Sequence, residues 1–149
     1  GTGRRSCTIC LVASAMSAQQ MSFWVSSLLV GTGGFLGSVL RYSVSGAVYR
    51  LFPETTFPWG TLAVNVIGCG LIGALAGLTE TRQLMGPEVR LLVIVGVLGG
   101  FTTFSTFGYE TINLLKAGGG VAALGNVALH ITTCLTAVWI GMAATTTGS

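Results

Sequence analysis

Four long apolar stretches with almost no charge constrain this chain more than any other feature. They cover residues 23–49, 59–78, 89–115 and 120–143. A helix needs about 20 apolar residues to cross the hydrocarbon core of a bilayer, and each stretch is long enough. The segments between them contain the prolines, glycines and charged residues that end helices. The sequence therefore predicts an all-α integral membrane protein with four transmembrane helices and no soluble domain.

The composition agrees with this prediction and excludes several classes of function. Only 7% of the residues are charged, whereas a soluble domain carries roughly 25%. The 23 glycines suit a membrane protein, because small residues let transmembrane helices approach closely. The seven lysines and arginines are scattered and form no basic patch for nucleic acid. The chain shows no carboxylate pair, nucleophile–base set or phosphate-binding loop, so we predict that it is not an enzyme.

The ends of the chain are expected to lie outside the membrane domain. Arg4 and Arg5 precede a short apolar run, as in a secretion signal, but its shortness favours an upstream extension before Met21. We predict a poorly ordered extension at residues 1–21, a four-helix domain at 22–144 and a tail at 145–149. Without the extension, the basic residues are nearly balanced across the membrane, so the positive-inside rule gives no orientation. Such balance is expected of a protein that inserts both ways.

A polar and aromatic segment interrupts the third stretch. Residues 99–107 read GGFTTFSTF, a glycine pair followed by four hydroxyl residues and three phenylalanines. Paired glycines weaken a helix. The backbone groups that a break frees are tolerated in a membrane only when they face protein, a cavity or an ion. The glycines also suit close helix packing, but we predict a functional break near the middle of the third helix.

Four side chains in or near the stretches suggest anion chemistry. Phe104 and Phe107 are three residues apart and share a helix face. Phenyl edges are electropositive, so two edges in a narrow passage can bind an anion; the alternative is a pair of core aromatics. Asn65 in the second stretch either bonds to a neighbouring helix or donates to an anion. Arg41 either pairs with Glu110 or attracts anions into a vestibule.

The cysteines and the single histidine predict less. Cys7 and Cys10 have no second pair at metal-ligand spacing. Cys69 and Cys134 fall inside apolar stretches, where a thiol behaves as a small hydrophobe. His130 is either a protonatable switch or, as we expect, a neutral ring bonded to a neighbour.

Together, three motifs resemble the Fluc (CrcB) family of fluoride channels. The first is residues 33–37 (GGFLG) followed by Arg41 and Tyr42, and the second is residues 60–65 (GTLAVN). The most specific motif is residues 99–107 followed by Glu110. The motifs occur in the family's order and spacing, and the resemblance covers residues 22–143. The fourth stretch departs from the family pattern, because Cys134 stands where a hydroxyl residue is common.

The resemblance implies an antiparallel, dual-topology homodimer with two fluoride pores along the interface of its copies. It implies passive electrodiffusive export of fluoride across the bacterial inner membrane, which lowers cytoplasmic fluoride and protects the cell from its toxicity. The pore residues it implies are Asn65, Phe104, Ser105, Thr106 and Phe107, with Arg41 in the vestibule. It also implies a structural Na⁺ at the dimer interface, held by the backbone carbonyls of Gly99 and Thr102. The expected partners are therefore fluoride, Na⁺, a second copy of the chain and the lipid bilayer.

Two other classes of protein also fit four short helices. A small multidrug exchanger is an antiparallel dimer too, but it uses a membrane-embedded carboxylate in its first span, and residues 23–49 contain none. A structural subunit of a larger membrane complex would explain the glycines. It would leave Asn65 and the phenylalanines of residues 99–107 unexplained.

Overall fold

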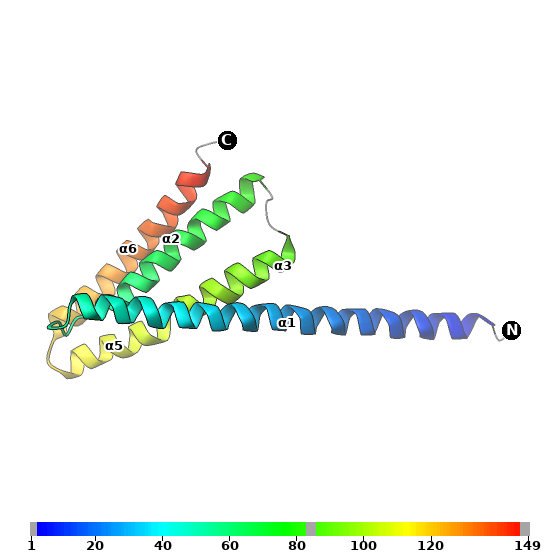
Figure 1. Ribbon diagram of the computed structural model, residues 1–149, viewed down its shortest axis with the longest axis horizontal. Coiled ribbons are helices and arrows are strands. Elements are labelled where there is room, and N and C mark those ends of the chain that lie inside the picture. The colour runs from blue at the N-terminus through cyan, green and yellow to red at the C-terminus, as the bar shows by residue number, and fades with distance from the viewer. Residues whose placement is uncertain (1–2, 83–85, 147–149) are drawn as a thin grey trace.

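The computed structural model describes the backbone of residues 3–82 and 86–146, and every regular element in those ranges is helical. Figure 1 shows a long first helix, a side-by-side helix pair and a third span built from several short pieces. The elements in chain order are α1 (Gly3–Leu51), α2 (Trp59–Arg82), α3 (Pro87–Arg90), the π-helix η1 (Leu91–Leu98), α4 (Gly99–Phe101), α5 (Phe104–Lys116) and α6 (Gly120–Thr146).

The prediction that the chain contains four helices able to span a membrane is confirmed. Four helical segments are long and apolar enough to cross a membrane, and they are Phe23–Leu51, Trp59–Thr79, Pro87–Lys116 and Gly120–Thr146. The structure continues α1 back to Gly3, and α6 ends at Thr146. The disorder expected for residues 1–21 stays a prediction. Residues 147–149 of the expected tail lie outside the described part of the chain.

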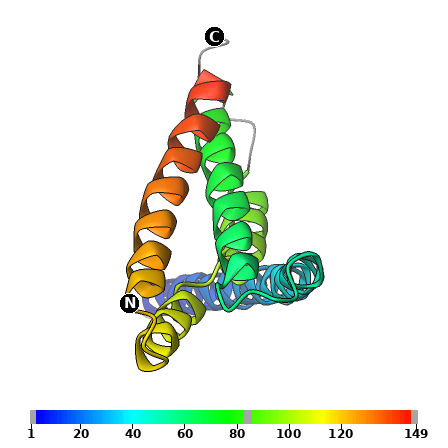
Figure 2. The same ribbon diagram turned by 90° about the vertical axis from the view of Figure 1, so that its left-hand side faces the viewer.

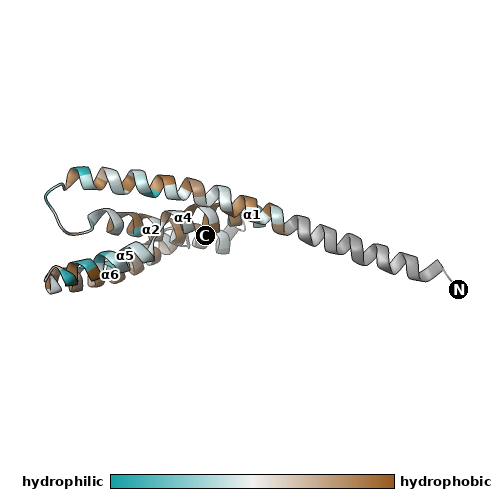
Figure 3. Cartoon of the chain, turned by 90° about the horizontal axis from the view of Figure 1, so that it is seen from below, coloured by the Kyte–Doolittle hydropathy of each residue, from teal (hydrophilic) through white to brown (hydrophobic). Residues whose placement is uncertain are grey.

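The outer surface of the helices is largely apolar, as a lipid-facing surface requires. Large hydrophobic side chains stand exposed on all four spans, among them Leu28, Leu71, Val95 and Trp139. Figure 3 shows hydrophobic residues spread along α1 and α6. A soluble monomer rarely exposes so continuous an apolar surface.

Among the described elements, helices α2 and α6 share the most extensive contact, and glycines let them touch. Figures 1 and 2 both show the two helices running side by side. A Cβ atom on Gly73 would fall onto the backbone of Val138, and one on Gly141 would fall onto the backbone of Gly70. The backbones therefore approach more closely than any larger residue permits, as is usual for small residues in membranes.

A second glycine contact joins α1 to the first half of the third span. A Cβ atom on Gly33 would meet Leu92 and Gly96, and one on Gly100 would meet the backbone of Gly34. Gly100 therefore serves close packing, whereas Gly99 is exposed and faces away from α1. Gly100 thus matches the packing interpretation, whereas Gly99 is helical (φ −64°, ψ −36°) and the break itself lies beyond the glycine pair.

Replacing Gly37 by alanine is expected to destabilise the protein strongly. Its Cβ would collide with the carbonyl of Val97 and lie 2.8 Å from the backbone nitrogen of Phe101, so two helices must move apart. Overpacking of this kind costs about 1–3 kcal/mol. Thermal unfolding in detergent measures the loss. Gly46→Ala is the matched control, because nothing lies within 4 Å of its Cβ position; equal unfolding temperatures for the two variants would contradict the prediction.

The third span is broken near its middle, as the sequence predicts. Helix α4 ends at Phe101 and α5 begins at Phe104. Thr102 (φ −77°, ψ 156°) and Thr103 (φ −151°, ψ 110°) between them are extended. The sequence did not predict the π-helical geometry of η1 before the break. Such geometry is rare and concentrates near functional sites.

Candidate functional site

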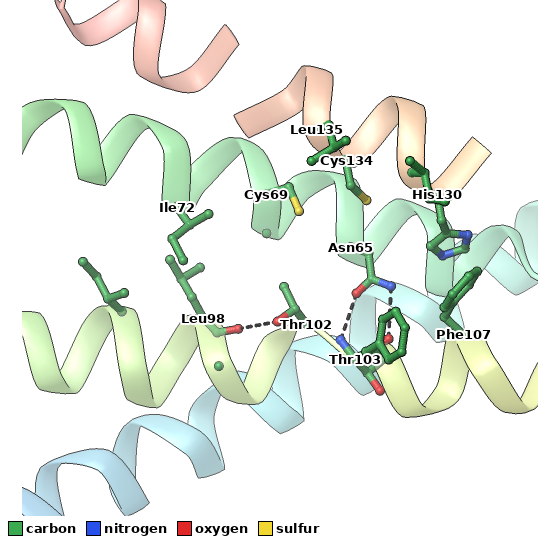
Figure 4. Close-up of a pocket in the computed structure, with 15 residues that line it drawn as sticks. Asn65, Cys69, Ile72, Leu98, Thr102, Thr103, Phe107, His130, Cys134 and Leu135 are labelled. Carbon is green, nitrogen blue, oxygen red and sulfur yellow. Dashed lines mark hydrogen bonds between the residues drawn. The ribbon is translucent and has the colours of Figure 1, made fainter. Parts of the chain in front are cut away.

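Asn65 holds the broken backbone of the third span with two hydrogen bonds. Its Oδ1 accepts from the backbone N–H of Thr103 at 2.8 Å, and its Nδ2 donates to the carbonyl of Thr103 at 3.1 Å (Figure 4). Asn65 is 8% exposed. The carboxamide therefore satisfies the N–H of Thr103, which the break would otherwise leave unpaired in the membrane. It adds a second bond to the Thr103 carbonyl, which as the N-cap group also accepts the first bond within α5. Of the two roles predicted for Asn65, the bond to a neighbouring helix is confirmed.

The hydroxyl groups after the break organise the start of α5. The Thr103 side chain caps the helix, because its Oγ1 accepts from the backbone nitrogen of Thr106 at 3.3 Å. Thr103 Oγ1 also donates to Thr106 Oγ1 at 2.9 Å and lies 3.3 Å from Ser105 Oγ. A helix start carries a partial positive charge. The predicted pore residues Ser105 and Thr106 thus belong to a hydroxyl cluster at that end of α5.

At the break, the carbonyls of Gly99 and Thr102 lose their helical partners, because side chains take the two N–H donors. In an uninterrupted helix, the N–H of Thr103 would donate to the carbonyl of Gly99, and the N–H of Thr106 to that of Thr102. Here the Thr103 N–H donates to Asn65, and the Thr106 N–H donates to the Thr103 hydroxyl. The two carbonyls predicted to hold a cation are therefore among those that lose their helical partners at the break.

A cavity of about 430 Å³ lies beside the break. It is bounded by α2, the two halves of the third span and α6, and its wall is mainly apolar. The structure brings five of the predicted site residues to this wall: Asn65, Gly99, Thr102, Phe104 and Phe107. Ser105, Thr106 and Arg41 do not line it. Among the described residues on its wall none is Lys or Arg.

An aromatic row on α5 and α6 runs along the cavity. The rings of Phe104 and Phe107 lie with centroids 5.3 Å apart, which confirms that they share a helix face. Phe107 also stacks on the ring of His130, with centroids 4.4 Å apart. Phe104 is 83% exposed, so most of its ring surface is uncovered within a single chain.

His130 presents one ring nitrogen that no described residue binds. Its Nδ1 lies 3.0 Å from the carbonyl oxygen of Asn126. A carbonyl only accepts, so Nδ1 carries the proton, and Nε2 of the neutral ring is an acceptor. Nε2 is buried and has no hydrogen-bond partner among the described side chains and backbone. The expectation that His130 is bonded to a neighbour is confirmed, since Asn126 is that neighbour.

A second polar cluster surrounds Glu110, and sequence reasoning missed its members. Oε1 of Glu110 accepts from Thr61 Oγ1 at 2.8 Å and from the Tyr49 hydroxyl at 3.2 Å. The carboxyl group is therefore held by α1 and α2, and no hydrogen bond or ion pair in the described part of the chain joins it to Arg41. The sequence does contain one indication for Thr61. It lies one helical turn before Asn65 and therefore shares the helix face of that polar residue.

Replacing Thr61 by valine is expected to lower the stability of the helix bundle. The change keeps the shape but removes a hydrogen bond to a carboxyl group, which contributes about 1–3 kcal/mol. Thermal unfolding in detergent reports the loss. Thr32→Val is the control, because the exposed Thr32 hydroxyl bonds only to Leu28 within its own helix. A Thr61 variant that unfolds at the same temperature as the control would show that Glu110 does not depend on this bond.

Comparison with known proteins identifies the family. Residues 28–142 match the family described as "CrcB-like protein, Camphor Resistance (CrcB)". The chain is 52% identical over 116 residues to a fluoride-specific ion channel FluC of Opitutus terrae, covering 76% of this chain and 87% of the relative. It is 47% identical over 117 residues to a protein of the same name from Geobacter sulfurreducens, covering 78% of this chain and 94% of the relative. These matches cover the four spans, and the chain belongs to the CrcB family.

Proposed function

We propose that this protein is a fluoride-selective ion channel through which fluoride moves passively across the membrane. The observation that carries the proposal is the broken third span, where Asn65, Phe104, Phe107 and His130 surround one cavity. Relatives that match most of the chain are named fluoride-specific ion channels, not enzymes. This agrees with the prediction from sequence that the chain has no enzymatic activity.

The groups near the cavity suit a small, strongly hydrated anion. Such an ion leaves water only where hydrogen-bond donors replace its hydration shell. The Asn65 amide carries two N–H groups, and the bond to Thr103 uses one of them. The hydroxyls of Ser105 and Thr106 and the edges of Phe104 and Phe107 add further positive contacts. The absence of Lys and Arg from the described cavity wall favours conduction, because the ion must also leave.

A second copy of the chain in the opposite orientation would complete the pathway. Phe104 is 83% exposed beside a polar helix break, and such a surface is poorly suited to lipid. An antiparallel partner would cover it and would place two equivalent breaks face to face. Two pores would then run along the interface, and the near balance of basic residues across the membrane suits insertion both ways.

A structural Na⁺ at the centre of that dimer is part of the proposal. Backbone carbonyls without partners are suitable ligands for a hard cation. The carbonyls of Gly99 and Thr102 have lost their helical partners at the break, and both residues line the cavity. Two copies would supply four such oxygens around one ion. The ion would neutralise carbonyls that lipid cannot satisfy.

The remaining assignments concern the pore entrance and the membrane. Arg41 is half-buried near the end of the first span, where a positive charge would raise the local concentration of anions. We assign it to the vestibule and not to the narrow part of the pore. The membrane proposed is the bacterial inner membrane, where passive export would lower cytoplasmic fluoride and protect the cell.

Fluoride efflux from liposomes that contain the purified protein tests the function. We expect rapid fluoride release after valinomycin is added to allow potassium to move, and no chloride release from matched vesicles. Such release would show an electrodiffusive pathway and exclude a proton-coupled drug exchanger. Folded, dimeric protein that releases no fluoride would overturn the proposal.

A further inference from the structure

Two cysteines from distant parts of the sequence meet at the cavity wall. Cys69 lies on α2 and Cys134 on α6, and both are free and half-buried. Both residues line the same cavity, and Figure 4 shows the two thiols next to each other between α2 and α6. Sequence reasoning treated each as an isolated small hydrophobe. The fold makes them a pair with access to the cavity.

The packing of α2 against α6 fixes this pair in place. Gly70 follows Cys69 directly, and its Cβ position lies 4.0 Å from the carbonyl oxygen of Ala137, one turn after Cys134. The tight contacts of Gly73 and Gly141 continue along the same seam. Because both backbones are held close at and beyond the cysteines, the two sulfur atoms stay together without a covalent bond.

We propose that Cys69 and Cys134 form a binding site for a soft, two-coordinate cation such as Ag⁺ or Cu⁺. On binding, each thiol releases its proton to water, and each sulfur forms one bond to the metal. Thiolates select soft cations. Zinc usually takes four ligands, and the described residues contain no group of three or more His, Cys, Asp or Glu that could hold a metal. The site therefore suits an ion that two sulfurs satisfy.

A cation held there would interfere with the pathway proposed for fluoride, and this consequence rests on the proposed function. Phe107, His130 and Asn65 line the same cavity as the two cysteines. A bound ion would narrow that space. Because two thiolates around one monovalent cation carry a net negative charge, the occupied site would also repel fluoride from the neighbouring phenyl edges. Soft cations are therefore expected to slow fluoride flux.

Native mass spectrometry of the full chain in detergent tests the site without reference to transport. The protein carries Cys7→Ser and Cys10→Ser, so that only Cys69 and Cys134 remain, and it is reduced before Ag⁺ is added in chloride-free buffer. We expect one Ag⁺ per chain, and at least a tenfold weaker affinity when either Cys69→Ser or Cys134→Ser is added. Undiminished binding in both single variants, or two ions per chain, would overturn the shared site.

Fluoride efflux from liposomes with and without Ag⁺ tests the consequence. Each variant is compared with itself, so a change in its basal rate does not matter. We expect Ag⁺ to slow efflux at least tenfold in the protein with both cysteines, and to have little effect in Cys69→Ser or Cys134→Ser. Binding of Ag⁺ without slower efflux would overturn the inhibitory role. Protein that binds Ag⁺ but releases no fluoride under any condition would instead contradict the proposed function.

Discussion

Replacing Asn65 by leucine is expected to abolish fluoride flux and to destabilise the protein. The change removes both hydrogen bonds to Thr103 and leaves its N–H unpaired in apolar surroundings, whereas its carbonyl keeps the bond within α5. One unpaired buried group costs about 1–3 kcal/mol. Thermal unfolding in detergent measures the loss of stability, and fluoride efflux from liposomes measures the loss of function.

Asn65→Asp separates the two roles of the amide. In these buried surroundings the new side chain is expected to be a neutral carboxylic acid. Its carbonyl oxygen can accept from the Thr103 N–H and its O–H can donate to the Thr103 carbonyl, but no donor is left for an anion. We expect protein that folds and assembles but conducts fluoride at least tenfold more slowly. Thr79→Val in the same helix is the control, because the Thr79 hydroxyl bonds only to Leu75 in its own turn. An Asn65→Leu variant with normal stability and flux would show that the break does not depend on this pairing.

Hydropathy predicts the four spans well, because the thickness of a bilayer fixes how long an apolar stretch must be. The start of the second span at Trp59 agrees with the sequence prediction. The break is also predictable, because Gly99 and Gly100 precede a run of hydroxyl residues that is out of place in lipid. These features depend on local composition, which a sequence shows directly.

The contacts between helices are less predictable, for a physical reason. Lipid is as apolar as a helix interface, so a membrane helix has no polar face to mark its outer side. Three contacts depend on how the helices rotate against each other. They join Asn65 to Thr103, Thr61 to Glu110 and Cys69 to Cys134. Glycine contacts set that rotation.

The π-helix η1 escaped prediction for a different reason. Its sequence, LLVIVGVL, is uniformly apolar apart from one glycine, and such a run does not distinguish a π-helix from an α-helix. Helix α1 packs directly against this segment, since a Cβ atom on Gly33 would meet Leu92 and Gly96. No local pattern in residues 91–98 contains that contact.

Replacing Phe104 or Phe107 by isoleucine is expected to slow fluoride flux strongly without preventing assembly. Isoleucine remains large and apolar, so packing against lipid or protein is largely kept. The electropositive ring edge is lost, however, and with it the contact proposed to replace water around the ion. We expect at least a tenfold lower efflux rate for each variant, equivalent to about 1.4 kcal/mol in the barrier. Liposome efflux measured on a fluoride electrode gives the rate, and size-exclusion chromatography tests whether each variant still forms the proposed dimer.

Phe23→Ile controls for the loss of a phenyl ring as such. Phe23 is 64% exposed at the start of the first span, far along the sequence from the break, and its ring packs on Trp24. We expect normal flux in this variant. Phe107 also stacks on His130, so its replacement disturbs two contacts, whereas replacement of Phe104 removes one ring edge. A larger effect at Phe107 is therefore expected. Normal flux in both the Phe104 and the Phe107 variants would exclude phenyl edges as the groups that bind fluoride.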